Sequence, residues 1–319
     1  MNSITNTIIW KRIVLPTALY LCELWGQLTF AETRMLAQTQ RYFVRFVLGL
    51  DKRSPTDSCT STVGLWYIQG LIDKFKLLFL GRLFRANSNT THKQLFTVRL
   101  NQLLLGESDK RSITYDLIKT LIKYAMHSFL ESYMDDLYIS DKKLSSKIVK
   151  QSIEIREENN WKSSIQSRPE LCRYYEIQNR LSIHRLLRLA VVYLHLNYKL
   201  LVMVKLGSIA IKDGQCSLCG CYSTDVVQHL ILYCEKLLDE RNNMFYRIVD
   251  VLPVQESVRF FQQDDSDIIV ALLGGITDFM QSVNSDNWRN MMCCLADHKF
   301  HLYGKFKGEL SEHRFNFGH

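Results

Sequence analysis

Four side chains that can bind a metal ion stand at ligand spacing in one short part of the sequence. They follow the pattern C-x2-C-x9-H-x4-C and are Cys216, Cys219, His229 and Cys234. Three thiolates and one imidazole are a typical ligand set of a structural zinc site. We therefore predict that these residues bind structural Zn²⁺ and that the ion organises the segment around them.

The residues between the ligands favour this arrangement. Gly220 directly follows the second cysteine, where it lets the chain fold back toward the metal. Apolar residues recur at helical spacing around the histidine: Val226, Val227, Leu230 and Ile231. His229 is thus predicted to project from a short helix, with Cys234 near its end. Three alternatives stay open. In the first, Cys221 replaces Cys219 as a metal ligand. In the second, the four residues bind no metal and belong to a reduced core. In the third, the C-x-x-C is a redox pair, although no βαβ pattern surrounds it.

Composition indicates a globular chain in a reducing compartment. Of its 319 residues, 47% are hydrophobic and 23% are charged, and only 4 Pro and 14 Gly interrupt helical patterns. The nine cysteines are an odd number, and the first residues contain no apolar segment of signal-peptide length. We therefore predict an intracellular protein, nuclear or cytoplasmic and not secreted.

The positive charge is concentrated in the first third of the chain. Residues 1–100 contain 13 Lys or Arg and 5 Asp or Glu, which accounts for the whole net charge of +8. This asymmetry predicts a polyanionic partner for the N-terminal third, RNA or DNA. The apolar-rich residues 186–206 include Arg188, His195, Lys199 and Lys205, and charges are costly at a bilayer centre. No membrane partner is expected.

Two helices are predicted in the first 50 residues. Pro16 suits the first turn of a helix over residues 15–25, and a second helix runs from about Ala31 to Leu48, with Gly49 as its stop. The second helix carries a basic face made of Arg34, Gln38, Arg41 and Arg45, with Tyr42 and Phe46 beside it. A nucleic-acid contact and an ordinary solvated face are both consistent with this pattern.

A polar turn and a third helix are predicted next. Residues 51–62 are rich in Ser and Thr and contain Pro55, which is typical of a turn. The third helix begins at Val63, and its apolar face is made of Leu71, Phe75, Leu78 and Phe79.

The order of these segments resembles the thumb region of non-LTR (LINE-like) retrotransposon reverse transcriptases. The matching pieces are Leu15 to Trp25, Ala31 to Leu50, Ser54-Pro55-Thr56 and Gly64 to Ile72. The family usually has a small residue before the glutamate of this motif, and Cys22 before Glu23 is a mild departure from that pattern. The resemblance implies that the basic helix faces a primer–template duplex, so Arg34, Arg41 and Arg45 are predicted nucleic-acid contacts.

A second match to the same family lies farther along the chain. Its pieces are Tyr174, Arg185 to Leu189, Cys216, Cys219, His229-Leu230, Cys234 and Arg241, in the order of the family's C-terminal module. The two matches cover residues 15–72 and 174–241. The resemblance implies a C-terminal part of a reverse transcriptase that binds template, primer or target DNA. The fingers and the catalytic palm are expected to be missing from this chain and to be partners of it.

Residues 133–136 read Tyr-Met-Asp-Asp, like the metal-binding box of a reverse transcriptase. We interpret the match as coincidental, and no enzymatic activity is predicted. The box belongs on a β-hairpin, whereas Leu130, Tyr133, Met134 and Leu137 form a helical stripe. No upstream strand pattern supplies a third carboxylate, and the box follows the thumb-like segments instead of preceding them.

A second basic region precedes the cysteines. Residues 171–205 contain six Lys or Arg and one acid, and the predicted nucleic-acid contacts are Arg173, Arg180, Arg185 and Arg188. Arg180, His184 and Arg188 are predicted to share a helix face. Tyr174 and Tyr175 are either base-stacking residues or core residues. Residues 205–241 hold four basic and five acidic residues, so the zinc module is predicted to be a scaffold and not itself a strong phosphate binder.

The predicted fold is mainly α-helical. Its parts are a thumb-like basic helical region (1–105), a helical connector (106–168), a basic helix with the CCHC zinc module (169–250) and a helical C-terminal tail (251–319). The tail is predicted to contain helices over 267–280 and 288–303. Helical spacing of Cys294, His298 and His301, with Cys293 beside them, would allow a second metal site, but no fixed fourth ligand is found. These residues are therefore interpreted as ordinary residues of a helix face. The competing function is a zinc-stabilised protein-interaction module or a decayed element fragment without activity.

Overall fold

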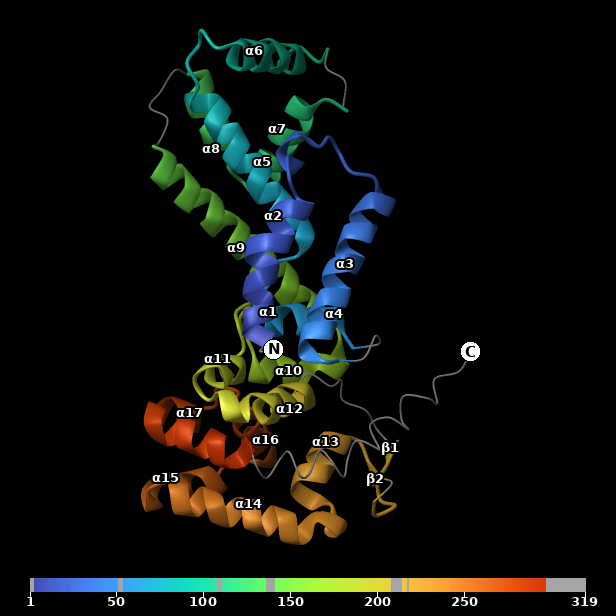
Figure 1. Cartoon of the computed structure of the whole chain (residues 1–319), viewed down its shortest axis with the longest axis vertical. Coiled ribbons are helices and arrows are strands. Elements are labelled where there is room, and N and C mark those ends of the chain that lie inside the picture. Colours follow the sequence, from blue (N-terminus) through green and yellow to red (C-terminus); the bar gives the residue numbers. More distant parts are fainter. Residues whose placement is uncertain are drawn as a thin grey trace. The chain divides into compact units, whose positions relative to one another are not determined.

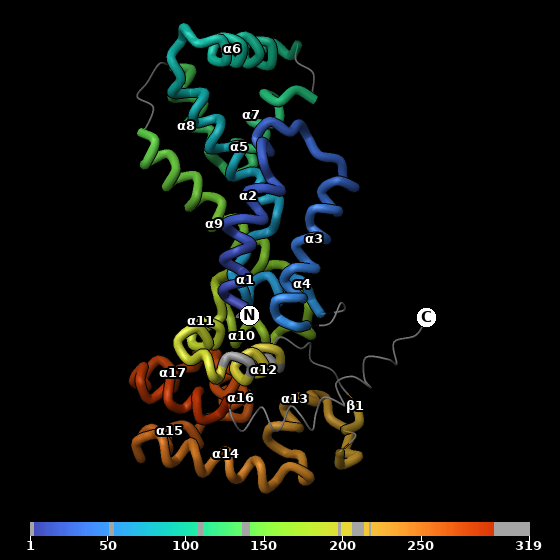
Figure 2. Tube along the Cα trace, in the orientation of Figure 1, coloured from blue at the N-terminus to red at the C-terminus, as the bar shows by residue number. Residues whose placement is uncertain are grey.

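The computed structural model describes residues 3–50, 54–107, 111–135, 141–207, 214–216 and 218–296. These residues are mainly helical, as predicted, and their only sheet has two strands (Figure 1). The chain divides into two compact units, and the trace in Figure 2 shows its path. Unit 1 comprises Met1–Ile8, Phe43–Leu65 and Lys162–His319, and unit 2 comprises Ile9–Tyr42 and Trp66–Trp161. Each unit thus combines distant parts of the sequence, and the division into four consecutive parts stays a prediction.

Unit 2 is built around one helix, α5. The helices that lie in it wholly or in part are α2 (Leu15–Ala18), α3 (Phe30–Leu48), α5 (Ile68–Arg85), α6 (Thr91–Leu104), α7 (Ile113–Lys123), α8 (His127–Met134) and α9 (Lys142–Gln166). Apolar residues of α5 to α9 form one core, which includes Leu80, Phe96, Leu121 and Ile153. The predicted helix over 15–25 is shorter than expected. The chain turns after Ala18, has positive φ at Leu21 (56°), and continues in the 3-10 turn Cys22–Leu24.

The capping chemistry of α3 explains both of its ends. Thr29 and Glu32 form a capping box, in which the Glu32 carboxylate accepts from the Thr29 backbone N–H (2.8 Å) and hydroxyl (2.7 Å). At the other end Gly49 has φ 59°, and Leu50 N–H donates to Arg45 C=O at 2.8 Å. This is the glycine stop that the sequence predicts, because a left-handed residue there satisfies the last carbonyls.

The buried side of α5 differs from the predicted apolar face. Leu71, Phe75, Leu78 and Phe79 are only half-buried, while the buried side includes the charged residues Asp73 and Lys76. Lys76 pairs with Asp116 of α7, and Asp73 accepts from the Lys123 ammonium (2.5 Å) and the Tyr124 hydroxyl (3.0 Å). Buried charges are tolerated when they are paired. The prediction from apolar periodicity alone therefore named the wrong side of α5 as the buried one. The helix also begins later, at Ile68: Val63 forms an isolated bridge with Ile183, and Gly64 has φ 61°.

Unit 1 contains most of the C-terminal half of the chain. Its elements include α1 (Ser3–Ile9), α4 (Thr56–Thr62), α10 (Cys172–Ile177), α11 (Arg185–Val192), α12 (Asn197–Gly207), β1 (Gly214–Gln215), β2 (Tyr222–Ser223), α13 (Val226–Gln228), α14 (Leu238–Val251), α15 (Val254–Phe261), α16 (Asp265–Leu272) and α17 (Asp278–Ser282). Residues 285–296 are helical as well. The helix predicted over 267–280 is interrupted by Gly274 at φ 84°, where a Cβ would lie 2.7 Å from Leu186 Cγ. His298 and His301 lie outside the described residues.

The segment predicted as a polar turn is a buried helix, α4. Its hydroxyls bond back to carbonyls one turn earlier, as in Thr60 Oγ1 to Thr56 C=O and Ser61 Oγ to Asp57 C=O, both at 2.8 Å. The Tyr174 hydroxyl of α10 donates to Ser58 C=O at 2.8 Å and lies 2.5 Å from Ser61 Oγ. Tyr174 is 2% exposed, so the structure supports its assignment to the core and not to base stacking. The Ser and Thr residues are buried because this network satisfies them.

The basic helix predicted from Arg180 through Arg188 is shorter. Residues 178–184 are not helical, and α11 begins after His184, which is its N-cap. Arg180, His184 and Arg188 therefore do not share a helix face. His184 is buried, and its Nδ1 accepts a hydrogen bond from Leu186 N–H at 3.2 Å, so this ring nitrogen carries no proton.

Unit 1 is expected to lose stability in mild acid through His184. Burial, with Arg185 nearby, lowers the pKa of the imidazole from 6.5 to about 4. Because the unfolded state binds the proton more readily, the free energy of unfolding should fall by about 3 kcal/mol as the pH drops from 6.5 to 4. Urea unfolding followed by circular dichroism at several pH values measures this loss. His184→Asn keeps an acceptor at the cap without titrating, so its loss over the same pH range should be smaller by that amount. Equal losses in both proteins would exclude His184 as the cause.

Candidate metal centre

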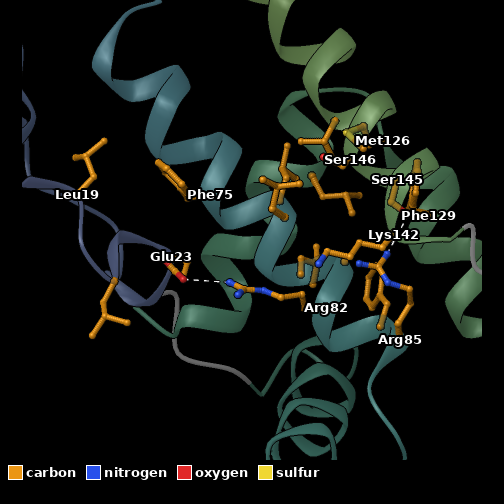
Figure 3. A pocket seen from close by; sticks show the side chains of 18 of the residues that line it. Leu19, Glu23, Phe75, Arg82, Arg85, Met126, Phe129, Lys142, Ser145 and Ser146 are labelled. Carbon is orange, nitrogen blue, oxygen red and sulfur yellow. Dashed lines mark hydrogen bonds and ion pairs between the residues drawn. The ribbon is translucent and has the colours of Figure 1, made fainter. Parts of the chain in front are cut away.

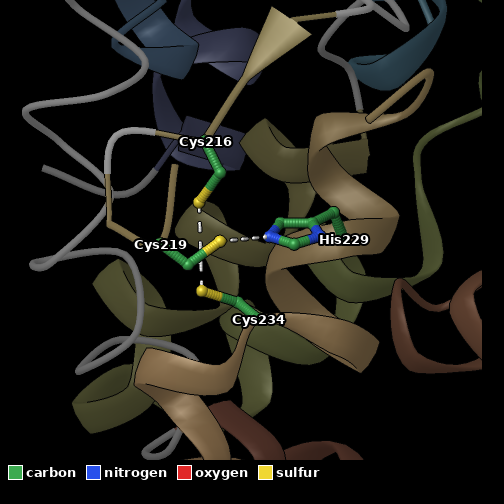
Figure 4. A group of neighbouring side chains, drawn as sticks. All are labelled: Cys216, Cys219, His229 and Cys234. Atoms are coloured by element: carbon green, nitrogen blue, oxygen red, sulfur yellow. Dashed lines mark hydrogen bonds between the residues drawn. The ribbon is translucent and has the colours of Figure 1, made fainter. Parts of the chain in front are cut away.

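The four predicted ligands converge in unit 1 (Figure 4). Their donor atoms all lie within 4.8 Å of one another. Cys219 Sγ is 3.2 Å from His229 Nε2, and Cys216 Sγ is 3.9 Å from Cys234 Sγ. The second distance is far above the roughly 2.05 Å of a disulfide bond. The pattern C-x2-C-x9-H-x4-C therefore describes a spatial cluster and not only a spacing.

A hairpin positions the first two ligands. Strands β1 and β2 pair antiparallel, with Gly214 opposite Ser223 and Gln215 opposite Tyr222. Between the strands, Cys216 N–H donates to Cys221 C=O (2.8 Å) and Gly220 N–H donates to Cys216 C=O (2.7 Å). Gly220 has φ 77°, a conformation that favours glycine, so the predicted reversal of the chain at this residue is confirmed.

A short helical segment positions the other two ligands. Asp225 caps α13, because its carboxylate accepts from Gln228 N–H (3.0 Å) and its carbonyl accepts from His229 N–H (2.9 Å). The chain continues through the π-helical turn His229–Tyr233, and Cys234 N–H donates to His229 C=O at 2.7 Å. The predicted apolar side is buried: Val226, Val227, Leu230 and Ile231. Val226, Leu230 and Leu237 form a small buried core together with Cys216 and Cys234.

Two arginines contact the residues that position the ligands. Arg173 of α10 is buried and forms an ion pair with Asp225, the cap of α13. Burial lowers the pKa of its guanidinium to about 10, still far above neutrality. Arg241 Nη1 donates to Cys234 C=O at 3.1 Å. Arg173 lies far from the ligands in sequence, so no local signal identified its role.

The residues present fit a zinc ion. Three thiolates and an imidazole are soft and borderline donors that suit Zn²⁺, and oxygen-preferring cations are disfavoured. Tetrahedral zinc with bonds of about 2.3 Å to sulfur places two sulfurs about 3.8 Å apart, close to the 3.9 Å between Cys216 and Cys234. Cys216, Cys234 and His229 are buried and Cys219 is half-buried, whereas Cys221 is exposed. The alternative in which Cys221 replaces Cys219 is therefore not supported.

The thiol of Cys219 is acidic for a cysteine. Its slight burial opposes ionisation, but hydrogen bonds from the Cys221 backbone and from the neighbouring thiols and His229 outweigh this and lower its pKa to about 6. A thiolate is the form that binds a metal ion. The cluster thus stabilises the thiolate of Cys219, whereas burial raises the pKa of Cys234.

The seven arginines predicted as nucleic-acid contacts fall into two groups. Four are exposed, and their side chains form no hydrogen bond or ion pair within the described part of the chain: Arg34, Arg41, Arg180 and Arg188. The other three are engaged internally. Arg45 donates to Ser54 C=O (2.6 Å), Arg185 lies over the Trp288 ring (4.4 Å from its centre), and Arg173 pairs with Asp225. Arg173 is 7% exposed, so a phosphate cannot reach it, and we withdraw it from the predicted contacts.

The Tyr-Met-Asp-Asp sequence lies at the end of a helix, as predicted. Helix α8 ends at Met134, and the Tyr133 ring stacks on Phe84 with ring centres 4.6 Å apart. The Tyr133 hydroxyl lies 3.2 Å from Thr97 Oγ1. Asp136 and Leu137 lie outside the described residues. Residues 127–134, which lead into the two aspartates, are thus helical and not a β-strand.

Unit 2 contains a cavity of about 460 Å³ beside α5 (Figure 3). Its wall is largely apolar, including Leu19, Phe75 and Met126, and two pairs of polar side chains in it contact one another. Arg82 pairs with Glu23 (3.1 Å), and Arg85 Nη1 donates to Ser145 Oγ (2.9 Å).

Within the described ranges, none of the helices has the length and apolar character needed to span a membrane. No family model, curated protein or solved structure matches this chain.

Proposed function

We propose that this chain is a nucleic-acid-binding part of a non-LTR-type reverse transcriptase, corresponding to the region after the catalytic palm, and that a structural zinc ion stabilises it. The observation that carries the proposal is the convergence of Cys216, Cys219, His229 and Cys234 within 4.8 Å. These residues carry the more specific of the two matches to the family. The thumb-like helices and the basic segment before the cysteines support it by their order in the sequence.

Zinc acts as a scaffold in this proposal. When bound, the ion links the β1–β2 hairpin to the turn after α13 and so contributes folding free energy. Residues 205–241, which contain the ligands, have four basic and five acidic residues and therefore no excess positive charge. This region is thus expected to bind phosphates weakly. The exposed arginines make the contacts with RNA or DNA, namely Arg34 and Arg41 on α3, Arg180 before α11 and Arg188 on α11.

A specific observation favours the competing function, a zinc-stabilised protein-interaction module. Several apolar side chains of α14 and α15 are exposed, namely Tyr246 (70%), Val249 (48%), Val254 (79%) and Val258 (50%). Exposed apolar groups of this kind are common at protein interfaces. Nucleic-acid affinity separates the two functions.

Binding to nucleic acid is expected to depend steeply on salt. Each phosphate neutralised on a duplex contributes about 0.9 to the fall of log K with log salt. The double variant Arg180→Glu/Arg188→Glu should therefore weaken binding and flatten the slope, which titrations at several salt concentrations measure. Arg289→Glu is the control for a charge reversal elsewhere in unit 1, because the Arg289 side chain is 43% exposed but already paired with Asp286. Absent or salt-insensitive binding by the unchanged chain would favour the interaction module.

A further inference from the structure

Helix α3 repeats a pair of exposed residues, an arginine followed by a large apolar side chain. The pairs are Arg34-Met35 and Arg41-Tyr42. Met35 is 66% exposed, Tyr42 is 61% exposed, and Phe30 at the start of the helix is 83% exposed. The pairs are seven residues apart, about two helical turns or 10 Å, so they form two parallel ridges, one basic and one apolar.

Contacts on the opposite side of α3 orient these ridges toward solvent. Gln40 is 2% exposed and donates to Trp66 C=O at 2.7 Å, and Leu36 and Ala37 are half-buried on the same side. The capping box of Thr29 and Glu32 secures the first turn. The Gln40 contact thus turns this side of α3 inward, and Arg34, Arg41 and Tyr42 face solvent.

The charge on this surface is uncompensated. Glu32 is the only acid between Phe30 and Leu48, and its carboxylate is occupied by Thr29. Arg34 and Arg41 form no hydrogen bond or ion pair in the described part of the chain. Two unpaired guanidinium groups beside exposed apolar side chains are complementary to a ligand that is both anionic and rich in flat apolar faces.

A single-stranded nucleic acid has both properties. In a duplex the base faces are stacked inside, and only phosphates and groove edges are accessible. In an unpaired strand the base faces are free, and aromatic side chains can stack on them while arginines follow the phosphates. Arginines alone would serve either form, whereas exposed rings such as those of Phe30 and Tyr42 can stack on bases only where the bases are unpaired.

We infer that α3 binds an unpaired nucleic-acid strand, with bases stacked on Phe30 and Tyr42 and phosphates held by Arg34 and Arg41. The inference rests on the proposed function and specifies its ligand. It differs from the expectation that the basic helix faces a primer–template duplex.

Fluorescence anisotropy with a labelled oligouridine and with a labelled hairpin duplex tests the inference. Stacking contributes about 1–3 kcal/mol per base, so Tyr42→Ala should weaken binding of the single strand about 5-fold to 150-fold. The duplex should be affected less than twofold, and the salt slope for the single strand should stay unchanged. Arg41→Gln should instead weaken both ligands and reduce the slope. Tyr246→Ala is the matched control, because this tyrosine is exposed to a similar degree on α14.

The outcomes separate this inference from the proposed function. If Tyr42→Ala and Phe30→Ala bind the single strand normally while Arg41→Gln does not, nucleic-acid binding stands and the stacking surface is wrong. If the aromatic variants change only the self-association of the chain, the ridge is a protein contact and the inference is overturned. If the unchanged chain binds neither ligand at low salt, the proposed function fails. Circular dichroism of each variant shows whether its fold is retained.

Discussion

Removing the metal is expected to unfold the segment from β1 to Leu237. Zinc binding in small zinc modules supplies on the order of 10–16 kcal/mol, most of which is folding free energy. The candidate ligands here sit in a two-stranded hairpin and short helical turns, with only a small apolar core around them. A strong chelator should therefore abolish the protection of backbone amides from hydrogen exchange across residues 218–237. Unit 2 contains no ligand of this site, so its exchange pattern should stay unchanged.

Single cysteine variants give the matched comparison. Cys216→Ser should lose stoichiometric zinc and show the same loss of protection without chelator, because Cys216 is a buried ligand. Cys221→Ser should retain one ion per chain, because Cys221 is exposed and outside the ligand set. A zinc-sensitive dye after denaturation measures the stoichiometry. Full zinc content in Cys216→Ser, or its loss in Cys221→Ser, would show that the ligand set is assigned wrongly.

Replacing Arg173 by Met is expected to destabilise unit 1 by about 3–5 kcal/mol, because it leaves the carboxylate of Asp225 buried without its partner. The Asp225 side chain is only 14% exposed. It also caps the helix that presents His229, so zinc affinity should fall together with stability. Urea unfolding of the zinc-bound protein measures the first effect, and competition with a zinc chelator measures the second.

Two further variants distinguish the ion pair from general damage. The double variant Arg173→Met/Asp225→Asn removes both charges and should recover part of the loss, since an unpaired buried charge costs more than a neutral pair. Arg180→Met changes an exposed arginine on the same segment and should alter stability by less than about 0.5 kcal/mol. If Arg173→Met were as mild as Arg180→Met, the contact with Asp225 would have no role in holding the metal site.

The candidate site was predictable because its determinants are close in sequence. The ligands, the turn at Gly220 and the buried valines of α13 all lie between residues 216 and 234, where spacing specifies geometry. The residues that support the site were not predictable. In the sequence, Arg173 is one of several basic residues in a basic segment. Only the fold places it in contact with Asp225.

The sequence by itself determined the helical class, the cluster of candidate metal ligands and the ends of α3, because hydrophobic periodicity, ligand spacing and capping act within a few residues. Only the tertiary structure decided which polar residues are buried. Lys76 meets Asp116 across 40 residues and Lys123 meets Asp73 across 50, and Tyr174 satisfies the hydroxyls of α4 from more than 110 residues away. A polar side chain can leave water only when a partner replaces its hydration. The partners in these pairs come from distant segments, so local sequence patterns could not reveal them.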